Sequence, residues 1–372
     1  MRILFQTRTN LYSAPGGDLV QMQKTKEYLE KLGAKVDISL EFEPDLSNYD
    51  IVHLFNLMEP QDIYRQYKNA KKQNKKIVLS TIYGLYTEYE RKARGGLFQK
   101  VANFLSPYQI SYIKTIVRHY HENRMHKGVI QMMLKGHYNL MKEIVNGVDY
   151  LLPNSDNEMK RIAQEFNLKN YNYYNTPNAI DTNIFNDQVE LSDDDLSKYG
   201  KYKDTVLCAA RIEGRKSTLN LVKAFKNLPY DLVLVGNESK NQKEFVEQVH
   251  KEAGKNVHFL GAVPHKDLAK LYKLAKVHCL ISWMETPGLS SLEAAAVDCN
   301  LVITKKGDTE EYFEDYAFYC EPDDVKSIEN AIHSAYNSPL NSNLKNKINS
   351  KYNWTKTAEV TFKAYSKALN KL

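Results

Sequence analysis

Two glutamates eight positions apart are the side chains whose spacing best suits chemistry. They end the run Glu285-Thr-Pro-Gly-Leu-Ser-Ser-Leu-Glu293, which follows a predicted strand, Val277–Ser282. The residues after Gly288 predict the start of a helix, whose free amides would form an anion site for a diphosphate. Glu293, on the first turn of that helix, could accept both hydroxyls of a ribose, and Glu285 could meet a sugar beyond the phosphates. In the simpler alternative, Glu285 is a loop carboxylate and Glu293 a first-turn acid favoured by the helix dipole.

A second cluster consists of cations. Arg211 and Lys216 stand five residues apart across a glycine loop, after the predicted strand Thr205–Ala209. Ligands of parallel sheets bind beyond the carboxyl ends of the strands, so we expect both cations at the same crevice as Glu285. Two cations facing a diphosphate would neutralise the charge that grows as a leaving group departs. The alternative is a solvated basic loop, for which Arg215 is the better candidate.

The elements that position these residues are predicted from alternating strand and helix patterns. The predicted strands are residues 2–6, 36–40, 51–55, 77–81 and 149–153, then 205–209, 231–235, 257–260, 277–282 and 300–304. Such alternation is typical of parallel sheets covered by helices on both faces. We therefore expect an α/β fold with two doubly wound, Rossmann-like domains, residues 1–185 and 200–354. The first domain is expected to contain a basic helical segment, 91–145, in which residues 97–145 form one or two long helices. The final helix, 355–372, is expected to pack back on the first domain.

These motifs resemble those of the retaining GT-B glycosyltransferases of family four, of the bacterial surface-polysaccharide type. The resemblance rests above all on Glu285 and Glu293, the alanine run that follows them, and the loop from Arg211 to Lys216. Further matches are Val233–Gly236, Phe259–Gly261, Pro177–Asp181 with Phe185, Thr309–Tyr312 with Pro322, and Tyr352–Trp354. The resemblance implies a GT-B fold, in which two Rossmann-like domains face a central cleft.

The resemblance also implies roles for individual residues. Arg211 and Lys216 would hold the donor diphosphate, Glu285 the transferred sugar, and Glu293 the ribose. The implied catalytic set is Arg211, Lys216 and Glu285, and the implied donor-binding residues are Glu293, Gly288, Leu289, Ser290, Gly236, Gly16 and Gly17. With these cations and helix amides present, neither a metal ion nor another cofactor is expected.

The implied activity is retaining transfer of a hexose-type sugar from a UDP- or GDP-sugar to an acceptor hydroxyl. The acceptor would be a saccharide, lipid-linked in the synthesis of capsule, O-antigen, lipopolysaccharide or exopolysaccharide. Two alternatives stay open, namely a GT-B nucleotide-sugar epimerase and a catalytically inactive sugar-nucleotide-binding protein. A dinucleotide oxidoreductase is disfavoured because no G-x-G-x-x-G follows a predicted strand.

Two features of the N-terminal half concern the acceptor side. Gly16 and Gly17 would let backbone amides approach a phosphate or an acceptor, although a plain turn is the alternative. Their position resembles that of the family's N-terminal glycine loop. Family members often carry a histidine after the strand that matches Ile77–Thr81, whereas this chain has Tyr83. Tyr83 can donate a hydrogen bond but is a poor base near neutral pH, so it is an acceptor-side candidate.

Positive charge is concentrated in residues 91–143, which hold ten Lys or Arg and two acidic residues. Apolar and aromatic side chains interleave with these cations. One hypothesis is that the segment docks on an anionic membrane leaflet, or near the diphosphate of a lipid-linked acceptor. The alternative is a basic helical insertion packed on its own domain. Nucleic acid is not expected as a partner, since no reading motif accompanies the charge.

The bulk composition is that of a globular protein with two domains. The 372 residues exceed the size at which one core keeps growing, and 42% of them are hydrophobic. Four cysteines without metal-ligand spacing indicate buried thiols in a reducing compartment. The acidic clusters Asp193–Asp195 and Asp323–Asp324 do not follow strands as a metal-bridged diphosphate site would need. Lacking a signal-peptide or membrane-span pattern, the protein is expected in the cytoplasm, peripheral on the inner membrane face.

Overall fold

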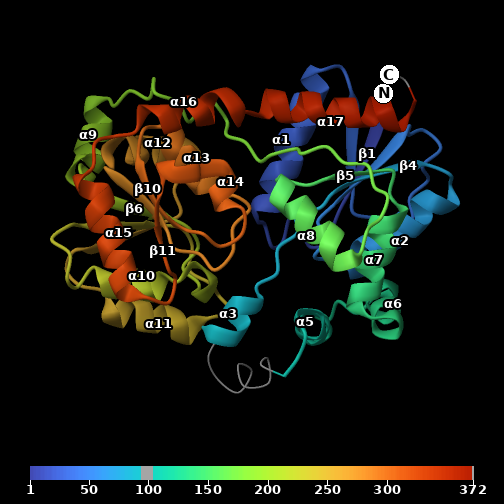
Figure 1. The fold of residues 1–372 in the computed structure, drawn as a ribbon, viewed down its shortest axis with the longest axis horizontal. Coiled ribbons are helices and arrows are strands. Elements are labelled where there is room, and N and C mark those ends of the chain that lie inside the picture. Colours follow the sequence, from blue (N-terminus) through green and yellow to red (C-terminus); the bar gives the residue numbers. More distant parts are fainter. Residues whose placement is uncertain (94–103, 371–372) are drawn as a thin grey trace. The chain divides into compact units, whose positions relative to one another are not determined.

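The computed structural model describes residues 1–93 and 104–370 of the chain. The chain separates into two compact units, each with its own sheet (Figure 1). The first unit comprises Met1–Thr87, Gly96–Asn178 and Trp354–Leu372, and the second comprises Glu88–Gly95 and Ala179–Asn353. The chain therefore enters the second unit earlier than the expected boundary at residue 185. Residues 88–95 also belong to the second unit, although the sequence on both sides of them belongs to the first.

The first unit is built on a five-stranded sheet in the order β2-β1-β3-β4-β5, with every neighbouring pair parallel. Its strands are β1 (Arg2–Gln6), β2 (Lys35–Ser39), β3 (Ile51–Phe55), β4 (Lys76–Ser80) and β5 (Tyr150–Leu152). Its larger helices include α1 (Gly17–Lys31), α2 (Pro60–Lys72), α8 (Asp156–Phe166) and α17 (Trp354–Ala368).

Helices cover both faces of this sheet because alternate side chains of a strand point to opposite sides. Val52 and Leu54 of β3 belong to the cluster that includes Ile63 of α2. Between them, His53 points the other way, and its Nδ1 lies 2.6 Å from the hydroxyl of Tyr365 on α17. The C-terminal helix α17 thus completes the first unit, where it packs against α1 (Figure 1).

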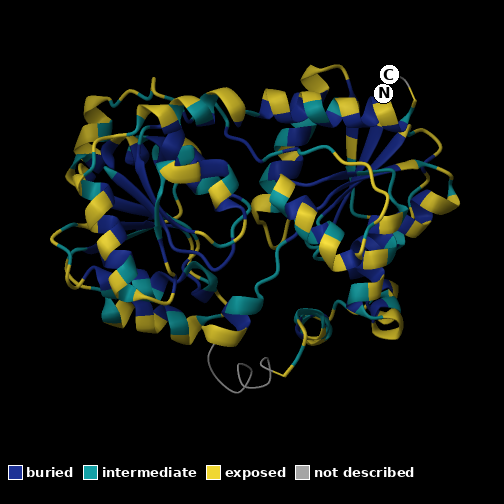
Figure 2. Cartoon of the chain, in the orientation of Figure 1, coloured by how far each residue is buried: buried dark blue, intermediate teal, exposed yellow. Residues whose placement is uncertain are grey.

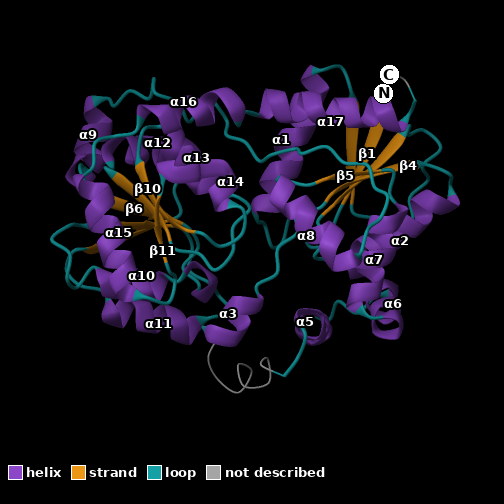
Figure 3. Ribbon diagram, viewed as in Figure 1, coloured by secondary structure: helices purple, strands orange, loops and turns teal. Residues whose placement is uncertain are grey.

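The second unit contains a six-stranded sheet in the order β11-β10-β9-β6-β7-β8, again parallel throughout (Figure 3). Its strands are β6 (Val206–Ala209), β7 (Leu232–Val235), β8 (Val257–Gly261), β9 (Val277–Leu280), β10 (Asn300–Thr304) and β11 (Phe318–Cys320). One face packs on α12 (His265–Leu274), α13 (Leu289–Ala296) and α16 (Ser342–Lys351), and the other on α10 (Thr218–Ala224), α11 (Lys243–Glu252) and α15 (Val325–Asn337). The predicted α/β class with parallel sheets is confirmed in both units.

Between residues 104 and 147, which the structure describes, the basic segment forms three separate helices, so the expectation of one or two long helices was wrong. They are α5 (Pro107–His121), α6 (Lys127–Lys135) and α7 (His137–Gly147), and α2 contacts both α6 and α7. Asn123 interrupts the segment with a left-handed φ of 50°, and Gly136 interrupts it again with φ of 84°. Both conformations end a helix because they direct the chain away from its axis.

All four cysteines, Cys208, Cys279, Cys299 and Cys320, are buried and free, in line with the expectation of unpaired core thiols. Burial raises the pKa of the Cys208 thiol to about 12, so it stays protonated and behaves as a small apolar side chain. Within the described ranges, the structure contains no helix whose length and apolar character would let it cross a bilayer.

Candidate functional site

The loop between β6 and α10 carries the two predicted cations. Arg211 is exposed, and its Nη1 lies 3.9 Å from Oε2 of Glu213. Lys216 lies in the short 3₁₀ turn η2 (Gly214–Lys216), and only 21% of its side chain is exposed. Ser217 follows with a left-handed φ of 44° and starts α10. The two cations therefore share a loop but differ in burial, and the predicted contact of Arg211 with a diphosphate stays a prediction.

Glu285 lies in the loop after β9, where its backbone is fixed from both sides. Its amide donates to the carbonyl of Lys306 at 3.2 Å, and its carbonyl accepts from the amide of Asp308 at 2.9 Å. Gly307, between these partners, has φ of 89°, and a Cβ there would come within 2.1 Å of the Glu285 carbonyl oxygen. Glycine at this position therefore lets the loop after β10 approach closely and fix the point from which the Glu285 side chain extends.

The structure brings Lys216 and Glu285 together. The amide of Trp283 donates to the carbonyl of Arg215 at 3.0 Å, which ties the loop after β9 to the loop after β6. Lys216 Nζ then contacts Glu285 Oε1 in an ion pair whose side chains are both largely buried. A buried ammonium needs a nearby anion, and in this unit the Glu285 carboxylate supplies it. A diphosphate bound here would offer Lys216 a second, more highly charged partner.

Helix α13 begins beside this ion pair. Gly288 precedes the helix with φ of 92°, and a Cβ at this position would lie 2.9 Å from Leu280 Cδ2 and 3.4 Å from Glu285 Oε2. The backbone angle favours glycine, and a side chain here would also have to displace the end of Leu280. The amides of Leu289 and Ser290 occupy the first turn, where a helix has no backbone acceptor for them. Amides without intrahelical partners therefore follow Gly288 directly, where they could bind an anion.

Glu293 was expected on the first turn of this helix, and that expectation was wrong. The helix begins at Leu289, so Glu293 is its fifth residue and the first turn holds no acidic side chain. Burial raises the pKa of the Glu293 carboxyl to about 8, so the free protein holds it mostly protonated at neutral pH. Near it lies the buried hydroxyl of Tyr272, whose pKa is raised by burial and by the charge of Glu293 and lowered by a hydrogen bond with the Ser290 side chain. Sequence reasoning did not single out Tyr272, because its spacing in α12 looks like that of any core residue.

Gly236, at the end of β7, has a packing role that the sequence did not predict. Its φ is 144°, and a Cβ there would come within 2.1 Å of the carbonyl oxygen of Ala210. The amide of Ile212 donates to the carbonyl of Asn237 at 3.0 Å, so the loops after β6 and β7 stay paired beyond their strands. Glycine at position 236 thus lets the loops after β6 and β7 approach each other, and this packing role does not depend on a ligand.

In the first unit, Gly16 and Gly17 lie at the start of α1, held by a buried arginine. Arg8 forms a two-point contact with Asp18, at 2.6 Å from Nε and 3.0 Å from Nη2, and also donates to the carbonyl of Ala14. Gly16 is exposed and has an extended φ of −148°, which any residue adopts. The loop is therefore shaped by Arg8, which the sequence analysis missed. The available signal was an arginine two residues after the buried strand β1.

Tyr83 lies in the core of the first unit. Its side chain is only 2% exposed, its hydroxyl lies 2.7 Å from that of Tyr108, and its ring packs against Phe166. Its amide donates to the buried carboxylate of Glu158 at 2.7 Å. Burial raises the pKa of the Tyr83 hydroxyl, which removes any role as a base. This placement argues against the predicted contact between the Tyr83 side chain and an acceptor.

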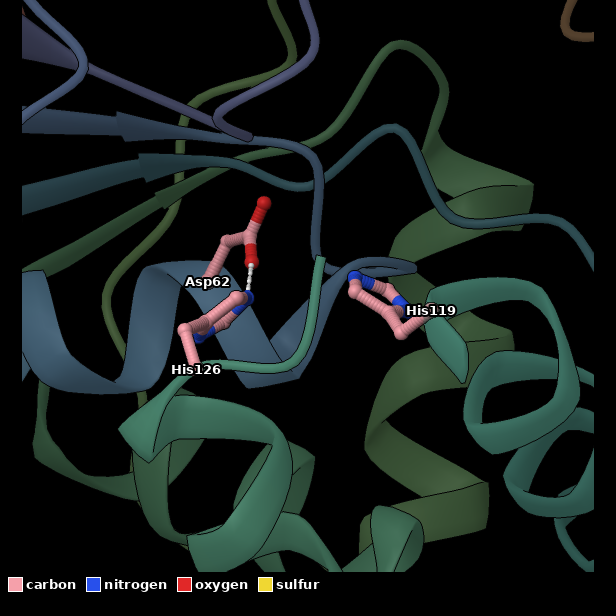
Figure 4. Close-up of side chains that lie close together, drawn as sticks. All are labelled: Asp62, His119 and His126. Atoms are coloured by element: carbon pink, nitrogen blue, oxygen red, sulfur yellow. Dashed lines mark ion pairs between the residues drawn. The ribbon is translucent and has the colours of Figure 1, made fainter. Parts of the chain in front are cut away.

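Figure 4 shows the three residues of the described chain whose side chains could jointly hold a metal ion, namely Asp62, His119 and His126. The His126 Nε2 lies 2.9 Å from Asp62 Oδ1, and the other Asp62 oxygen accepts from the amide and hydroxyl of Thr9. His126 Nδ1 accepts from the amide of Gly128, which places the proton of a neutral ring on Nε2, facing the carboxylate. A metal ion would have to displace that proton. The contacts of Asp62 and His126 therefore fit a structural role, in which they hold the loop at Thr9.

Comparison with known proteins places this geometry in a family. The family model described as Glycosyl transferases group 1 matches residues 192–353. The match covers less than half of the chain and shows that these residues are similar to that family. The chain is a glycosyltransferase, and the matched range contains Lys216, Glu285 and the start of α13. Gly16, Gly17 and Tyr83 lie outside it.

Solved structures of the same fold cover the whole glycosyltransferase. Sucrose-phosphate synthase from Thermosynechococcus elongatus is 15% identical, with a TM-score of 0.75 and full coverage of both chains. Anabaena Alr3699/HepE in complex with UDP and glucose is 15% identical, with a TM-score of 0.69 over 99% of this chain and 100% of that one. A glycosyltransferase from Rickettsia africae is 13% identical, with a TM-score of 0.71 over 100% and 99%. No curated protein sequence matches the chain significantly. At these identities the likeness establishes the GT-B fold alone.

Proposed function

We propose that this glycosyltransferase moves a hexose-type sugar from a UDP- or GDP-sugar to an acceptor hydroxyl, with retention of the anomeric configuration. The observation that carries the proposal is the ion pair of Lys216 and Glu285 beside the first amides of α13. That HepE was solved with UDP and with UDP-glucose favours a donor of this class. The donor site and the reaction are otherwise inferred from the charges and their positions.

In the proposed step, the diphosphate of the donor takes Lys216 as its counter-ion, with Arg211 of the same loop beside it. The bond between the anomeric carbon and the diphosphate oxygen breaks, and the acceptor oxygen bonds to the same face of that carbon. The acceptor proton passes to the departing phosphate. The amides of Leu289 and Ser290 donate to phosphate oxygens, because a helix N-terminus favours negative charge.

A change of ion-pair partner on donor binding explains why Lys216 and Glu285 lie in contact. Once the diphosphate holds the Lys216 ammonium, the Glu285 carboxylate is left to accept hydroxyls of the transferred sugar. Glu293 accepts the ribose hydroxyls, which favours its charged form. The pKa of the Glu293 carboxyl is about 8 in the free protein, so donor binding near neutral pH releases a proton.

The proposed acceptor is a lipid-linked saccharide in the synthesis of a surface polysaccharide, reached from an anionic membrane. Large apolar side chains are exposed on α5 and α6, namely Ile113, Val117 and Tyr120 on α5 and Ile130, Met133 and Leu134 on α6. Figure 2 shows exposed residues, in yellow, on both helices. The three on α5 are spaced by four and three residues, so they share one face of that helix. Apolar side chains on helices that also carry cations favour contact with a lipid surface.

The charge of this segment is partly neutralised within the first unit. Both terminal nitrogens of Arg118 bind Glu59, and Lys135 lies 3.1 Å from Glu143. Arg94 and Lys100 lie outside the described residues. Since each cation near an anionic surface contributes about 1 kcal/mol, binding needs the apolar side chains as well as the charges.

Flotation with phosphatidylserine-containing vesicles tests the membrane contact. Val117→Ser with Leu134→Ser, and separately Lys114→Glu with Lys127→Glu, should each reduce binding several-fold, and salt should weaken it. Lys169→Glu, an exposed lysine elsewhere in the first unit, is the matched control and should bind as the wild type does. Equal flotation of all variants, or none by the wild type, would exclude this surface.

The donor and the reaction are tested together. A thermal-shift screen against UDP- and GDP-sugars identifies the donor, and the anomeric configuration of the product is then read by NMR. Lys216→Ala should lower kcat by roughly 10²–10³-fold, as loss of one stabilising group does, while Lys223→Ala in α10 should leave it unchanged. Isomerisation of the donor without an acceptor would identify an epimerase. Absence of nucleotide-sugar binding would identify an inactive protein.

A further inference from the structure

A short helix that interrupts the first unit in sequence packs on the donor-side loops of the second. Helix α3 (Thr87–Lys92) follows the segment after β4, and residues 88–95 belong to the second unit (Figure 1). The sequence on both sides of this excursion returns to the first unit. Neither the predicted domain boundaries nor the proposed reaction accounts for it.

Tyr89 is one of the two buried residues of this helix, the other being Glu90. Tyr89 is 7% exposed, and its hydroxyl lies so close to Gly214 that a Cβ there would come within 2.4 Å of it. Its ring centroid is 6.3 Å from that of Trp283. Gly214 and Trp283 each stand two residues before a member of the ion pair, Lys216 and Glu285. One tyrosine ring thus fills the space between the two loops that carry these charges.

A second contact of α3 reaches the third loop of the site. Glu88 Oε1 lies 3.0 Å from Nζ of Lys306, and the backbone carbonyl of Lys306 accepts the amide of Glu285. Burial alone would raise the pKa of Glu88, but hydrogen bonds from Lys92 and Lys306 outweigh it and lower that pKa. Glu88 is therefore charged at neutral pH and holds the segment that fixes the Glu285 backbone.

We propose that Tyr89 and Glu88 are positioning residues of the glycosyltransferase, which set the separation of Lys216 and Glu285. The inference rests on the proposed donor site. Helix α3 contacts Gly214, Trp283 and Lys306, which lie on the three loops that converge at Glu285. Removing the Tyr89 ring therefore lets the loops of Gly214 and Trp283 shift. A displacement of about 1 Å at reacting groups is enough to reduce turnover by about 100-fold.

Kinetics of paired variants test this role. Tyr89→Ala should lower kcat by about 10–100-fold with a smaller change in donor KM, since the displaced groups act mainly on charge that develops in the transition state. Tyr89→Phe keeps the ring between the loops and should lose much less. Tyr171→Ala, which removes a half-exposed tyrosine of the first unit, is the control for loss of an aromatic side chain.

A spectroscopic readout separates positioning from unfolding. The chain has two tryptophans, so Trp354→Phe leaves Trp283 as the sole reporter of the α3 contact. In that background Tyr89→Ala should shift Trp283 emission to the red and raise its quenching by acrylamide, whereas Tyr89→Phe should retain the wild-type emission. If Tyr89→Ala does not fold, as judged by circular dichroism, Tyr89→Leu replaces it and keeps most of the apolar volume.

The outcomes distinguish this inference from the proposed function. Normal turnover of Lys216→Ala would overturn the donor site itself. Slow turnover of Lys216→Ala together with wild-type turnover of the folded Tyr89 variants would leave the donor site standing and overturn the role of α3. Unchanged Trp283 emission in Tyr89→Ala would overturn it as well, because the ring would then not support that loop.

Discussion

The two glycine-containing loops that were expected to meet a ligand are stabilised in different ways. In the second unit, the chemistry-bearing side chains are themselves buried, since Lys216 and Glu285 pair beside Gly288. In the first unit, Gly16 is exposed, and the buried pair of Arg8 and Asp18 lies beneath it. In the second unit the charged side chains of the candidate site are thus already in place. In the first unit a backbone loop is exposed, and the pair of Arg8 and Asp18 holds it. A change in the second unit should therefore act on chemistry, and a change in the first on the stability of a loop.

The largest effect is expected at Gly288. Gly288→Val forces a branched side chain to a φ of 92° and against Leu280, which displaces the start of α13 and the nearby Glu285 carboxylate. Loss of both helix amides and the carboxylate position should reduce kcat by at least about 100-fold. The kcat values of Gly288→Val and the wild type can be compared only if thermal unfolding shows that the variant is folded. A folded Gly288→Val enzyme with wild-type kcat would mean that the α13 start does not contact the donor.

The next effect concerns stability of the first unit. Arg8→Met breaks a pair whose side chains are only 8% and 9% exposed, and leaves Asp18 charged and buried. We expect destabilisation of roughly 3–5 kcal/mol, measured by urea unfolding. Arg2→Met removes the exposed pair with Asp37, 4.0 Å apart, and should cost less than about 1 kcal/mol. Similar losses for the two variants would show that the buried pair supports the first unit no better than an exposed pair does.

A smaller effect follows from the raised pKa of the Glu293 carboxyl. Its folded value of about 8 lies above the ordinary value of 4.5, so the folded state binds this proton more tightly than the unfolded state. Stability contributed by the protonated group is therefore complete below pH 4.5 and is lost as pH rises toward 8. Glu293→Gln should flatten this part of the melting-temperature profile. If the melting temperatures of the wild type and of Glu293→Gln rose from pH 5 to 8 with the same slope, this expectation would be contradicted.

The smallest effect is expected on removal of metals. The proposed donor site relies on Lys216 and helix amides, and Asp62 is already in contact with His126 and Thr9. Chelation with EDTA should therefore change transfer by less than about twofold, with Mn²⁺ or Mg²⁺ adding nothing. Loss of activity on chelation, restored by Mn²⁺, would show that a cation completes the donor site.

The sheets could be predicted from sequence because buried parallel strands are nearly continuous apolar runs. Val277–Ser282 was expected, and β9 spans Val277–Leu280. The edge strand β11 was missed, since it has three residues and is only partly buried. That Gly288 precedes a helix beside Glu285 could also be predicted, because the two residues are close in sequence, whereas the chemistry assigned to them stays a prediction.

What the sequence could not predict depends on contacts between distant residues. Arg8 looks like any loop cation until Asp18 is placed beside it, and Tyr83 looks like a site residue until Tyr108 and Phe166 surround it. The helix containing Tyr89 follows the first sheet in sequence but packs against Trp283, nearly two hundred residues later. Pattern and spacing carry no information on such pairings, so the residues that support a site are harder to find than those that form it.

Calorimetric titration of Lys216→Met tests the central claim most directly. Whichever of UDP or GDP binds the wild-type enzyme is titrated beside its nucleoside, which lacks the phosphates. The account predicts that the variant binds the diphosphate at least about tenfold more weakly, which is about 1.4 kcal/mol, while its affinity for the nucleoside is unchanged. Equal affinity of the variant and the wild type for the diphosphate would show that Lys216 does not contact a donor phosphate.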